Sequence, residues 1–455
     1  MVIKDIIKKQ RDYFNNGRTR DVDFRIEQLR LLKKTIKDNE DKILNALNKD
    51  LKKSYFEGYE TEVGILLEEI DYTIKKVKSW AKSKRVKTPI THFLSRSYIH
   101  PEPYGVVLIM APWNYPFQLT IAPLIGAIAA GNCSILKPSE YSNYTSEIIY
   151  NIIKENFDEG FVAVIKGGRE VNEKLLNENF DYIFFTGSIP VGKIVMEAAA
   201  KNLTPVTLEL GGKSPCIVDK DIDTKLAARR IVWGKFLNAG QTCVAPDYLL
   251  VHEDTKDKLI KDMKEIINEF YGDNPKESPD YPRIINKKHL DRLSNLLNSG
   301  NILVGGETDK ESLYIEPTII DNVSWEDSVM ADEIFGPILP IIEYRNIEEV
   351  IEMVNSYYKP LALYLFSNNK LNIDKIKGNI PFGGGCINDT IVHLASPYMP
   401  FGGVGSSGMG SYHGKASFDT FSHKKSILKK SNLFDIKLRY PPYKNKLNIL
   451  KKLMK

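Results

Sequence analysis

The chain has 455 residues, and its 63 lysines and arginines against 58 aspartates and glutamates give a net charge of +5 at pH 7. A hydrophobic fraction of 42% and a charged fraction of 27% are typical of globular proteins, so the composition excludes a disordered or fibrous protein. The surplus of positive charge is small for this length, and nucleic-acid binding is not indicated. At about 150 residues per domain, the length predicts two or three domains.

The spacing of the cysteines and histidines limits which compartment and which kind of site the sequence predicts. Cys133, Cys216, Cys243 and Cys386 form neither a disulfide framework nor a Cys-x-x-Cys motif, which indicates a reducing compartment, and we expect a cytoplasmic protein. The seven histidines show no His-Glu-x-x-His spacing, so no metal site is predicted. The most apolar stretch, at 119–130, is too short to cross a bilayer.

Residues 1–82 are predicted to be helical, because apolar side chains recur at helical spacing. Residues 83–103 alternate in polarity between prolines and predict an extended, hairpin-like arm. From Gly105 onward, strand and helix alternate four times, with strands expected at 106–111, 133–137, 162–166 and 182–186. This order predicts a doubly wound parallel sheet that binds its ligand beyond the carboxyl ends of the strands.

A second α/β unit follows, and it is predicted from the same alternation. The final residues contain a glycine-rich stretch at 401–410, a strand expected at 418–421 and a lysine-rich tail. After the four repeats, strands are expected at 206–210 and 214–218, and a helix at 224–236. In the second unit, strands are expected at 248–251, 302–304, 315–320, 338–344 and 361–366, and helices at 256–270, 287–298 and 347–354.

Cys243 lies at the centre of a predicted loop, 236–248, between a helix and a strand. A loop held between two rigid elements can present a side chain to a bound molecule. Alone, the loop leaves two interpretations open, because a free cysteine is most often a buried and inert small hydrophobe.

Two other stretches end strands of the predicted parallel sheet. The turn 186–192 has glycines at both Gly187 and Gly192 before a helix, which favours an anionic pyrophosphate, although its spacing matches neither Gly-x-Gly-x-x-Gly nor a P-loop. Lys137 and Glu140 stand at the end of another strand of the sheet, one strand away from the glycine turn. Their side chains can hydrogen-bond an adenosine ribose. The alternatives are an ordinary glycine turn and a solvated charged turn.

Two side chains are candidates for acid–base and oxyanion chemistry. Asn114 stands at a strand end, where its amide can donate to a developing oxyanion. Alternatively, it caps the next helix or hydrogen-bonds its own turn. Glu209 lies between two leucines, where burial would raise its pKa and suit it to general-base work, unless it faces solvent. Glu333 and Phe335, in Glu-Ile-Phe-Gly-Pro, carry no interpretation by themselves.

Six strings, taken in order, resemble the aldehyde dehydrogenase superfamily over nearly the whole chain. Gln241 and the strings at 246–248 and 400–410 resemble its class 3, the fatty and aromatic aldehyde branch. Class 3 members usually form homodimers through the arm. The six strings are Pro-Trp-Asn-Tyr-Pro-Phe, Lys-Pro-Ser-Glu, Phe-Thr-Gly-Ser, Leu-Glu-Leu-Gly-Gly-Lys-Ser-Pro, Gly-Gln-Thr-Cys and Glu-Ile-Phe-Gly-Pro.

The resemblance implies a division of the chain into parts with separate roles. An NAD(P)-binding domain is expected at 1–82 and 104–208, and a catalytic domain at 209–395. The oligomerisation arm is expected at 83–103 and 411–431, and a basic tail at 432–455.

The resemblance also implies roles for single residues. Cys243 would attack the aldehyde carbon, the amide of Asn114 and the backbone N–H of Cys243 would hold the oxyanion, and Glu209 would activate the water that hydrolyses the thioester. NAD is the expected cofactor, and the class often accepts NADP. Residues implied to bind the cofactor are Lys137, Glu140, Thr186, Gly187, Ser188, Gly192, Glu333 and Phe335. Residues implied by analogy to line an apolar acyl channel, suited to medium- or long-chain or aromatic aldehydes, are Tyr115, Trp233, Leu237, Ile391 and Phe401.

Two alternatives to this function stay open. A coenzyme A-acylating dehydrogenase would pass the thioester to a thiol instead of water, and Glu209 argues against it. A catalytically silent NAD-binding or structural protein would keep the fold without the set Asn114, Glu209 and Cys243. The chain ends at Lys455 without a long apolar segment, so we expect no transmembrane anchor and a solvated tail. Weak contact of the basic tail with a membrane surface is the alternative.

Overall fold

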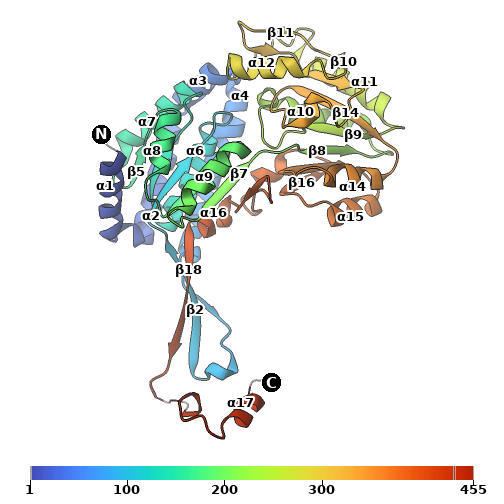
Figure 1. The fold of residues 1–455 in the computed structure, drawn as a ribbon. Coiled ribbons are helices and arrows are strands. Elements are labelled where there is room, and N and C mark those ends of the chain that lie inside the picture. The colour runs from blue at the N-terminus through green and yellow to red at the C-terminus, as the bar shows by residue number, and fades with distance from the viewer. Residues whose placement is uncertain (1–2, 434, 436, 454–455) are drawn as a thin grey trace.

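The computed structural model describes residues 3–433, 435 and 437–453. Two α/β halves lie side by side, and a long thin arm projects from the body (Figure 1). The predicted α/β class with parallel-sheet domains is confirmed.

The first half contains a six-stranded sheet in the order β17-β7-β6-β3-β4-β5. All neighbouring strands are parallel except β17, which is antiparallel to β7. The central strands are continuous apolar runs because helices cover both faces. Their bounds are β3 Val106–Met110, β4 Cys133–Lys137, β5 Val162–Val164, β6 Tyr182–Gly187, β7 Val206–Leu210 and β17 Gly408–Met409.

Helix α6 (Gln118–Ala130) is buried along its whole length in this half, and this burial accounts for its apolar sequence. It connects β3 to β4 along the chain and packs against both strands, and the N-terminal helices α2 and α5 pack on it. The other helices of this half are α1 Ile3–Asn15, α2 Val22–Asp38, α3 Glu40–Leu51, α4 Tyr55–Gly58, α5 Ile65–Trp80, α7 Asn143–Asn156, α8 Arg169–Leu176 and α9 Ile189–Ala200, with a π-helical turn, η2, at Tyr59–Gly64.

The second half contains a seven-stranded sheet in the order β10-β13-β14-β9-β8-β15-β16, parallel except for β10. Its strands are β8 Pro215–Val218, β9 Tyr248–His252, β10 Asn301–Val304, β13 Thr318–Asp321, β14 Ile338–Tyr344, β15 Ala362–Phe366 and β16 Gly384–Ile387. A separate pair is formed by β11 Thr308–Asp309 and β12 Tyr314–Ile315. Its helices are α10 Thr224–Phe236, α11 Lys256–Tyr271, α12 Lys287–Leu296, α13 Ser328–Ala331, α14 Ile347–Asn355 and α15 Lys370–Asn379.

Two expectations for the second half differ from the structure. The single strand expected at 315–320 is two short strands in different sheets, β12 and β13, separated by Glu316 and Pro317. Proline has no N–H to donate to a ladder and ends the first pairing. Helix α15 and the edge strand β16 were not predicted; Gly384 and Gly385 in β16 hide the usual strand signal.

The arm is a three-stranded antiparallel sheet of β1 (Lys84–Val86), β2 (Ser95–Pro103) and β18 (Ser422–Lys430). The strand expected at 418–421 is wrong, because residues 418–420 end helix α16 (Gly414–Thr420) and Phe421 caps it. The helix packs on α5 and α6. Phe418 and Phe421 are both buried, and their separation of three residues is a helical spacing. The arm's third strand therefore begins at Ser422, inside the expected segment 411–431 but after its first residue.

The tail lies beyond the tip of the arm and carries helix α17 (Leu447–Leu453) (Figure 1). Leu447, Ile449 and Leu450 are exposed on it. Met454 and Lys455, which belong to the expected basic tail, lie outside the described residues, as do Met1 and Val2 at the other end. Within the described part of the chain, no helix is both long and apolar enough to cross a membrane.

Gly126 provides a test of the packing of α6 on α16. A Cβ at Gly126 would lie 2.6 Å from the Cβ of Ser417, whereas a Cβ at Gly378 in α15 would have no atom within 4 Å. We expect Gly126→Ala to lower the free energy of unfolding by about 1–3 kcal/mol through overpacking. Gly378→Ala should leave it unchanged or raise it by up to about 1 kcal/mol, because alanine favours helix. Thermal unfolding followed by circular dichroism compares the two; equal midpoints would contradict the tight contact.

Candidate active site

Cys243 follows a buried turn in which three successive residues have left-handed backbone angles. Helix α10 ends at Phe236, and Asn238, Ala239 and Gly240 then have φ values of 52°, 50° and 72°. Glycine is required at 240, because a Cβ would lie 2.2 Å from the carbonyl oxygen of Gly336. The turn reverses the chain between α10 and β9, and it leaves Cys243 half-buried.

Cys243 is where two cavities meet. The larger has a volume of 720 Å³ and is lined by Cys243, Asn114 and Glu209, with Thr186, Gly187, Ser188, Gly192, Glu333 and Phe335 further along it. The smaller has a volume of 200 Å³ and is lined by Cys243 and by all five predicted channel residues, Tyr115, Trp233, Leu237, Ile391 and Phe401. Lys137 and Glu140 do not line either cavity; they lie at and beyond the carboxyl end of β4.

Asn114 is buried and turned toward the Cys243 loop. Its Nδ2 donates one hydrogen bond to the carbonyl oxygen of Gln241, at 3.0 Å, and its Oδ1 has no hydrogen-bond partner among the described residues. An amide nitrogen carries two hydrogens, so the second stays available for a ligand in the cavity. Helix α6 begins at Gln118 and has no side-chain cap, so the helix-capping interpretation of Asn114 is wrong.

Glu209 is a buried carboxyl group in β7, 3% exposed, and neither of its oxygens has a hydrogen-bond partner among the described residues. This burial raises the pKa of Glu209 well above its usual value. The interpretation of Glu209 as a solvent-facing strand residue is therefore wrong. Burial without a compensating partner favours the neutral form of the carboxyl group, and water or a positive charge entering the cavity makes its ionisation easier.

The thiol of Cys243 is also neutral in the free protein. Burial, followed by the negative charges of Glu333 and Glu209, raises the pKa of Cys243 to about 12. The backbone N–H groups of Cys243 and Val244 act in the opposite direction and lower it. Formation of the thiolate at neutral pH therefore requires a base or a nearby positive charge.

The larger cavity has features that suit a dinucleotide. The hydroxyl of Thr186 is buried at the carboxyl end of β6, and it has no hydrogen-bond partner in the part of the chain that the structure describes. Ser188 then begins α9, whose first backbone N–H groups attract an anion. Gly192 has no room for a side chain, since a Cβ would lie 2.6 Å from Leu210. These residues fit a pyrophosphate lying against the turn.

Of the three ionisable residues implied to bind the cofactor, Glu333 lines the larger cavity, whereas Lys137 and Glu140 do not. Burial, with the charge of Asp247, raises the pKa of Glu333 to about 8, and a Cβ at Gly211 would lie 2.0 Å from a carboxylate oxygen of Glu333. Burial lowers the pKa of Lys137 to about 8, and its Nζ donates to the carbonyl oxygen of Pro138 at 2.7 Å. Glu140 is exposed.

The smaller cavity contains residues that sequence reasoning missed. Gln118, Tyr412 and His413 line it beside the predicted apolar side chains. The Tyr115 hydroxyl shares a hydrogen bond of 2.7 Å with the Thr242 hydroxyl, next to Cys243. His289 and Arg292 similarly line the larger cavity without having been predicted. Gln118, Tyr412, His413, His289 and Arg292 lie in none of the six strings, so only the fold identifies them.

The chain has two parallel-sheet halves, and Cys243 lies between a crevice suited to a dinucleotide and an apolar cavity. This arrangement is that of an α/β oxidoreductase with a cysteine at its centre. The sequence matches the aldehyde dehydrogenase family over residues 2–427. The chain belongs to that family and is an NAD(P)-dependent aldehyde dehydrogenase.

Several relatives share most of the chain. It is 52% identical to the 4,4'-diaponeurosporen-aldehyde dehydrogenase of Staphylococcus aureus, over 100% of this chain and 99% of the relative. It is 50% identical to the dimeric NADP-preferring aldehyde dehydrogenase of Rattus norvegicus, over 97% and 98% of the two chains. Among solved structures, a substrate-bound state of S. aureus AldH is 51% identical with a TM-score of 0.98 over 100% of both chains. An NAD-dependent aldehyde dehydrogenase from Sinorhizobium meliloti is 27% identical, with a TM-score of 0.86 over 95% of this chain and 87% of that one.

The charge of Glu333 should control the reactivity of the Cys243 thiol. The pKa of Glu333 is about 8, so its carboxylate is ionised above that pH and holds the pKa of Cys243 high. We expect Glu333→Gln to alkylate faster at Cys243 with iodoacetamide at pH 9, because each unit by which the pKa falls gives about tenfold more thiolate. Mass spectrometry of the Cys243 peptide measures the rate.

Glu352→Gln, at an exposed position on α14, is the control and should alkylate like the wild type. An unchanged or slower rate in Glu333→Gln would contradict the electrostatic account of the thiol.

Proposed function

We propose that the enzyme oxidises aldehydes to carboxylic acids through a thiohemiacetal and a thioester on Cys243, and that water releases the acid. One observation carries the proposal: Asn114, Glu209 and Cys243 line one cavity, and the apolar cavity ends at the same thiol. A nucleophile, an oxyanion donor and a base at one point are the groups that this reaction needs.

The proposed steps use these three residues in turn. The Cys243 thiolate attacks the aldehyde carbon, and the oxyanion that forms is held by Nδ2 of Asn114 and the backbone N–H of Cys243. The bound NAD(P) supplies the acceptor for the hydride that leaves this carbon. Glu209 then takes a proton from water as the water attacks the thioester, and Cys243 leaves as the thiolate. The raised pKa of Glu209 makes it a stronger proton acceptor than an ordinary glutamate.

The cofactor is proposed to lie in the larger cavity. Thr186, Gly187, Ser188 and Gly192 would hold the pyrophosphate at the start of α9. The nicotinamide half would rest against Glu333 and Phe335, near Cys243. At the carboxyl end of β4, Lys137 and Glu140 would contact the adenosine ribose, as strand-end residues do in other doubly wound sheets.

The apolar cavity is proposed to hold the aldehyde chain. Its lining by Tyr115, Trp233, Leu237, Ile391 and Phe401 supports medium- or long-chain aliphatic, or aromatic, aldehydes as substrates. The S. aureus relative is named for 4,4'-diaponeurosporen-aldehyde, so this compound joins octanal and benzaldehyde as substrates to try.

An aldehyde panel tests the function and the substrate class together. With either cofactor and no coenzyme A, we expect octanal and benzaldehyde to give equal amounts of NAD(P)H and carboxylic acid, with a higher kcat/KM than succinic semialdehyde. Desolvation of a charged carboxylate in an apolar channel has no compensation, which is the reason for the difference. NAD(P)H absorbance and chromatography of the acid provide the two readouts.

Glu209→Gln separates hydrolysis from the earlier steps. It should release one equivalent of NAD(P)H per active site and then turn over about 10²–10⁴-fold more slowly, because water loses its base. With the wild type, acyl-coenzyme A formed when coenzyme A is added, and no acid formed in its absence, would favour the acylating alternative. The absence of NAD(P)H with every aldehyde in the panel would favour the catalytically silent one.

The arm is proposed to join two subunits into a homodimer. In the order β1-β2-β18, β18 is an edge strand of nine residues with exposed Ile427 and Leu428, and such an edge is a template for pairing with another chain. The R. norvegicus relative is named as dimeric. Analytical ultracentrifugation should give a dimer that Leu428→Asp weakens, and a wild-type monomer at micromolar concentration would contradict the proposal.

A further inference from the structure

A buried ion pair lies beneath the loop that carries Asn114. Lys53 and Glu62 are both 0% exposed, and Nζ of Lys53 lies 2.5 Å from Oε1 of Glu62. Lys53 stands between α3 and α4, and Glu62 is in the π-helical turn η2, so both come from the N-terminal helices. No sequence motif included either residue.

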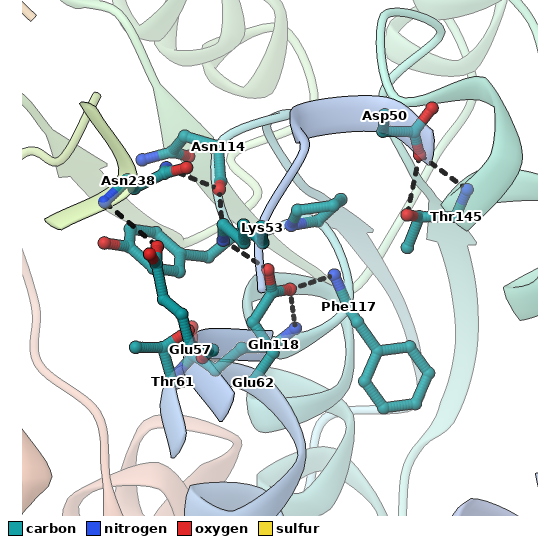
Figure 2. A network of polar contacts seen from close by, with 12 residues as sticks. Asp50, Lys53, Glu57, Thr61, Glu62, Asn114, Phe117, Gln118, Thr145 and Asn238 are labelled. Atoms are coloured by element: carbon teal, nitrogen blue, oxygen red, sulfur yellow. Dashed lines mark hydrogen bonds and ion pairs between the residues drawn. The ribbon is translucent and has the colours of Figure 1, made fainter. Parts of the chain in front are cut away.

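The ion pair forms hydrogen bonds with the backbone at both ends of the Asn114 loop (Figure 2). Nζ of Lys53 donates to the backbone carbonyl oxygen of Asn114 at 3.0 Å, and it lies 3.9 Å from the ring centre of Tyr115. Oε2 of Glu62 accepts from the backbone N–H groups of Phe117 and Gln118, at 2.9 and 3.3 Å. The carbonyl before the loop's bend and the N–H groups that begin α6 are thus tied to one ion pair.

A second carboxylate ties the Cys243 loop to the same point. Oε1 of Glu57 accepts from the backbone N–H of Asn238 at 2.9 Å, and Figure 2 shows this contact beside the ion pair. Nδ2 of Asn238 donates to the carbonyl oxygen of Asn114 at 2.8 Å and to that of Gln241 at 3.1 Å. The Asn114 side chain donates to the same Gln241 oxygen. The Asn114 carbonyl therefore has two donors, Lys53 and Asn238, one from each side of the site.

Stability alone does not explain such a network. Replacing a buried ion pair with apolar side chains is often neutral or stabilising, because each charge loses its hydration. The pair instead fixes the conformation of the Asn114 loop. Lys53 can contact both Glu62 and the Asn114 carbonyl only when the loop holds that carbonyl toward Nζ. A π-helical turn, such as the one that carries Glu62, is also frequent near functional sites.

We propose that Lys53 and Glu62 are positioning residues for aldehyde oxidation, which hold the Asn114 amide at the place where the oxyanion forms. The inference rests on the proposed function, in which Asn114 is an oxyanion donor. Lys53 lines neither cavity and reaches the site through the backbone carbonyl of Asn114 and the ring of Tyr115. Loss of the pair lets the loop shift, and a misplacement of about 1 Å at a catalytic group can cost a hundredfold in rate.

A double-mutant cycle between Lys53 and Asn114 tests this role. Lys53→Met alone leaves Glu62 as an unpaired buried charge, so the test variant is Lys53→Met/Glu62→Gln, which removes both charges. Its glutamine oxygen can still accept from Phe117 and Gln118. We expect this variant to lower kcat/KM with octanal by about tenfold to a hundredfold, with the Kd for NAD unchanged. In an Asn114→Ala background, the same change should have almost no further effect, because the amide that it positions is gone.

Arg25→Met is the matched control for loss of a buried cation. Arg25 is 6% exposed and donates to backbone carbonyls of Thr19, Arg20 and Ala129, the last at the far end of α6 from Asn114. It should lower the thermal midpoint and leave kcat/KM unchanged at a temperature where the protein is folded.

Equal losses of kcat/KM in the wild-type and Asn114→Ala backgrounds would overturn the positioning role, and so would wild-type kcat/KM in the double variant. A crystal structure of Lys53→Met/Glu62→Gln gives a readout that does not depend on activity, and an Asn114 amide left in place would also overturn it. If instead the wild type oxidised no aldehyde while that crystal structure showed a displaced amide, the proposed function would fail and the structural part of the inference would stand.

Discussion

The left-handed turn at Asn238, Ala239 and Gly240 is the constraint on which the site depends. Non-glycine residues in this conformation are strained by about 1–3 kcal/mol each, and they persist only where surrounding contacts hold them. Here the contacts come from Glu57, which accepts from the Asn238 N–H, and from Gln241, whose Nε2 donates to the Asn238 carbonyl at 3.0 Å. Because the turn is fixed, the next residues along the chain bring the Cys243 thiol to the junction of the two cavities.

Burial at the same junction favours the neutral forms of its ionisable groups. Burial raises the pKa of Cys243, Glu209 and Glu333, so each of these groups holds its proton, and stays neutral, to a higher pH than it would in water. Three negative charges so close to one another would destabilise the fold, whereas three neutral groups do not. Binding of a cationic ring near Cys243 would favour the thiolate, and this links the chemistry to the presence of cofactor.

Much of the fold was predictable because buried parallel strands are continuous apolar runs. The bounds of β4, β7 and β14 match the expected ranges, since burial on both faces leaves a signal that needs no tertiary information. The segment 418–421 failed because four residues do not distinguish a strand from the last turn of a helix, and only contact with α6 decides it. Strand β16 was not predicted, because its two glycines have no side chains and so give no pattern of alternating polarity.

The site divides in the same way. Asn114, Glu209 and Cys243 could be proposed because their strings, taken together and in order, resemble a family, although each string alone left two interpretations open. The cavity then brings the three residues together. Lys53, Glu57 and Glu62 could not, because a charged residue among helices is usually solvated and nothing in the local sequence marks it as buried. The supporting network of a site is thus less visible in sequence than the groups that it supports.

The central claim is that Cys243 carries the acyl group between hydride transfer and hydrolysis. Rapid acid quench of the enzyme during turnover of octanal with NAD, followed by mass spectrometry of its peptides, tests this most directly. We predict an octanoyl adduct on the Cys243 peptide that appears with the first equivalent of NADH and decays as the acid is released. An adduct on another residue, or NADH formed at full rate with Cys243 unmodified throughout, would contradict the account.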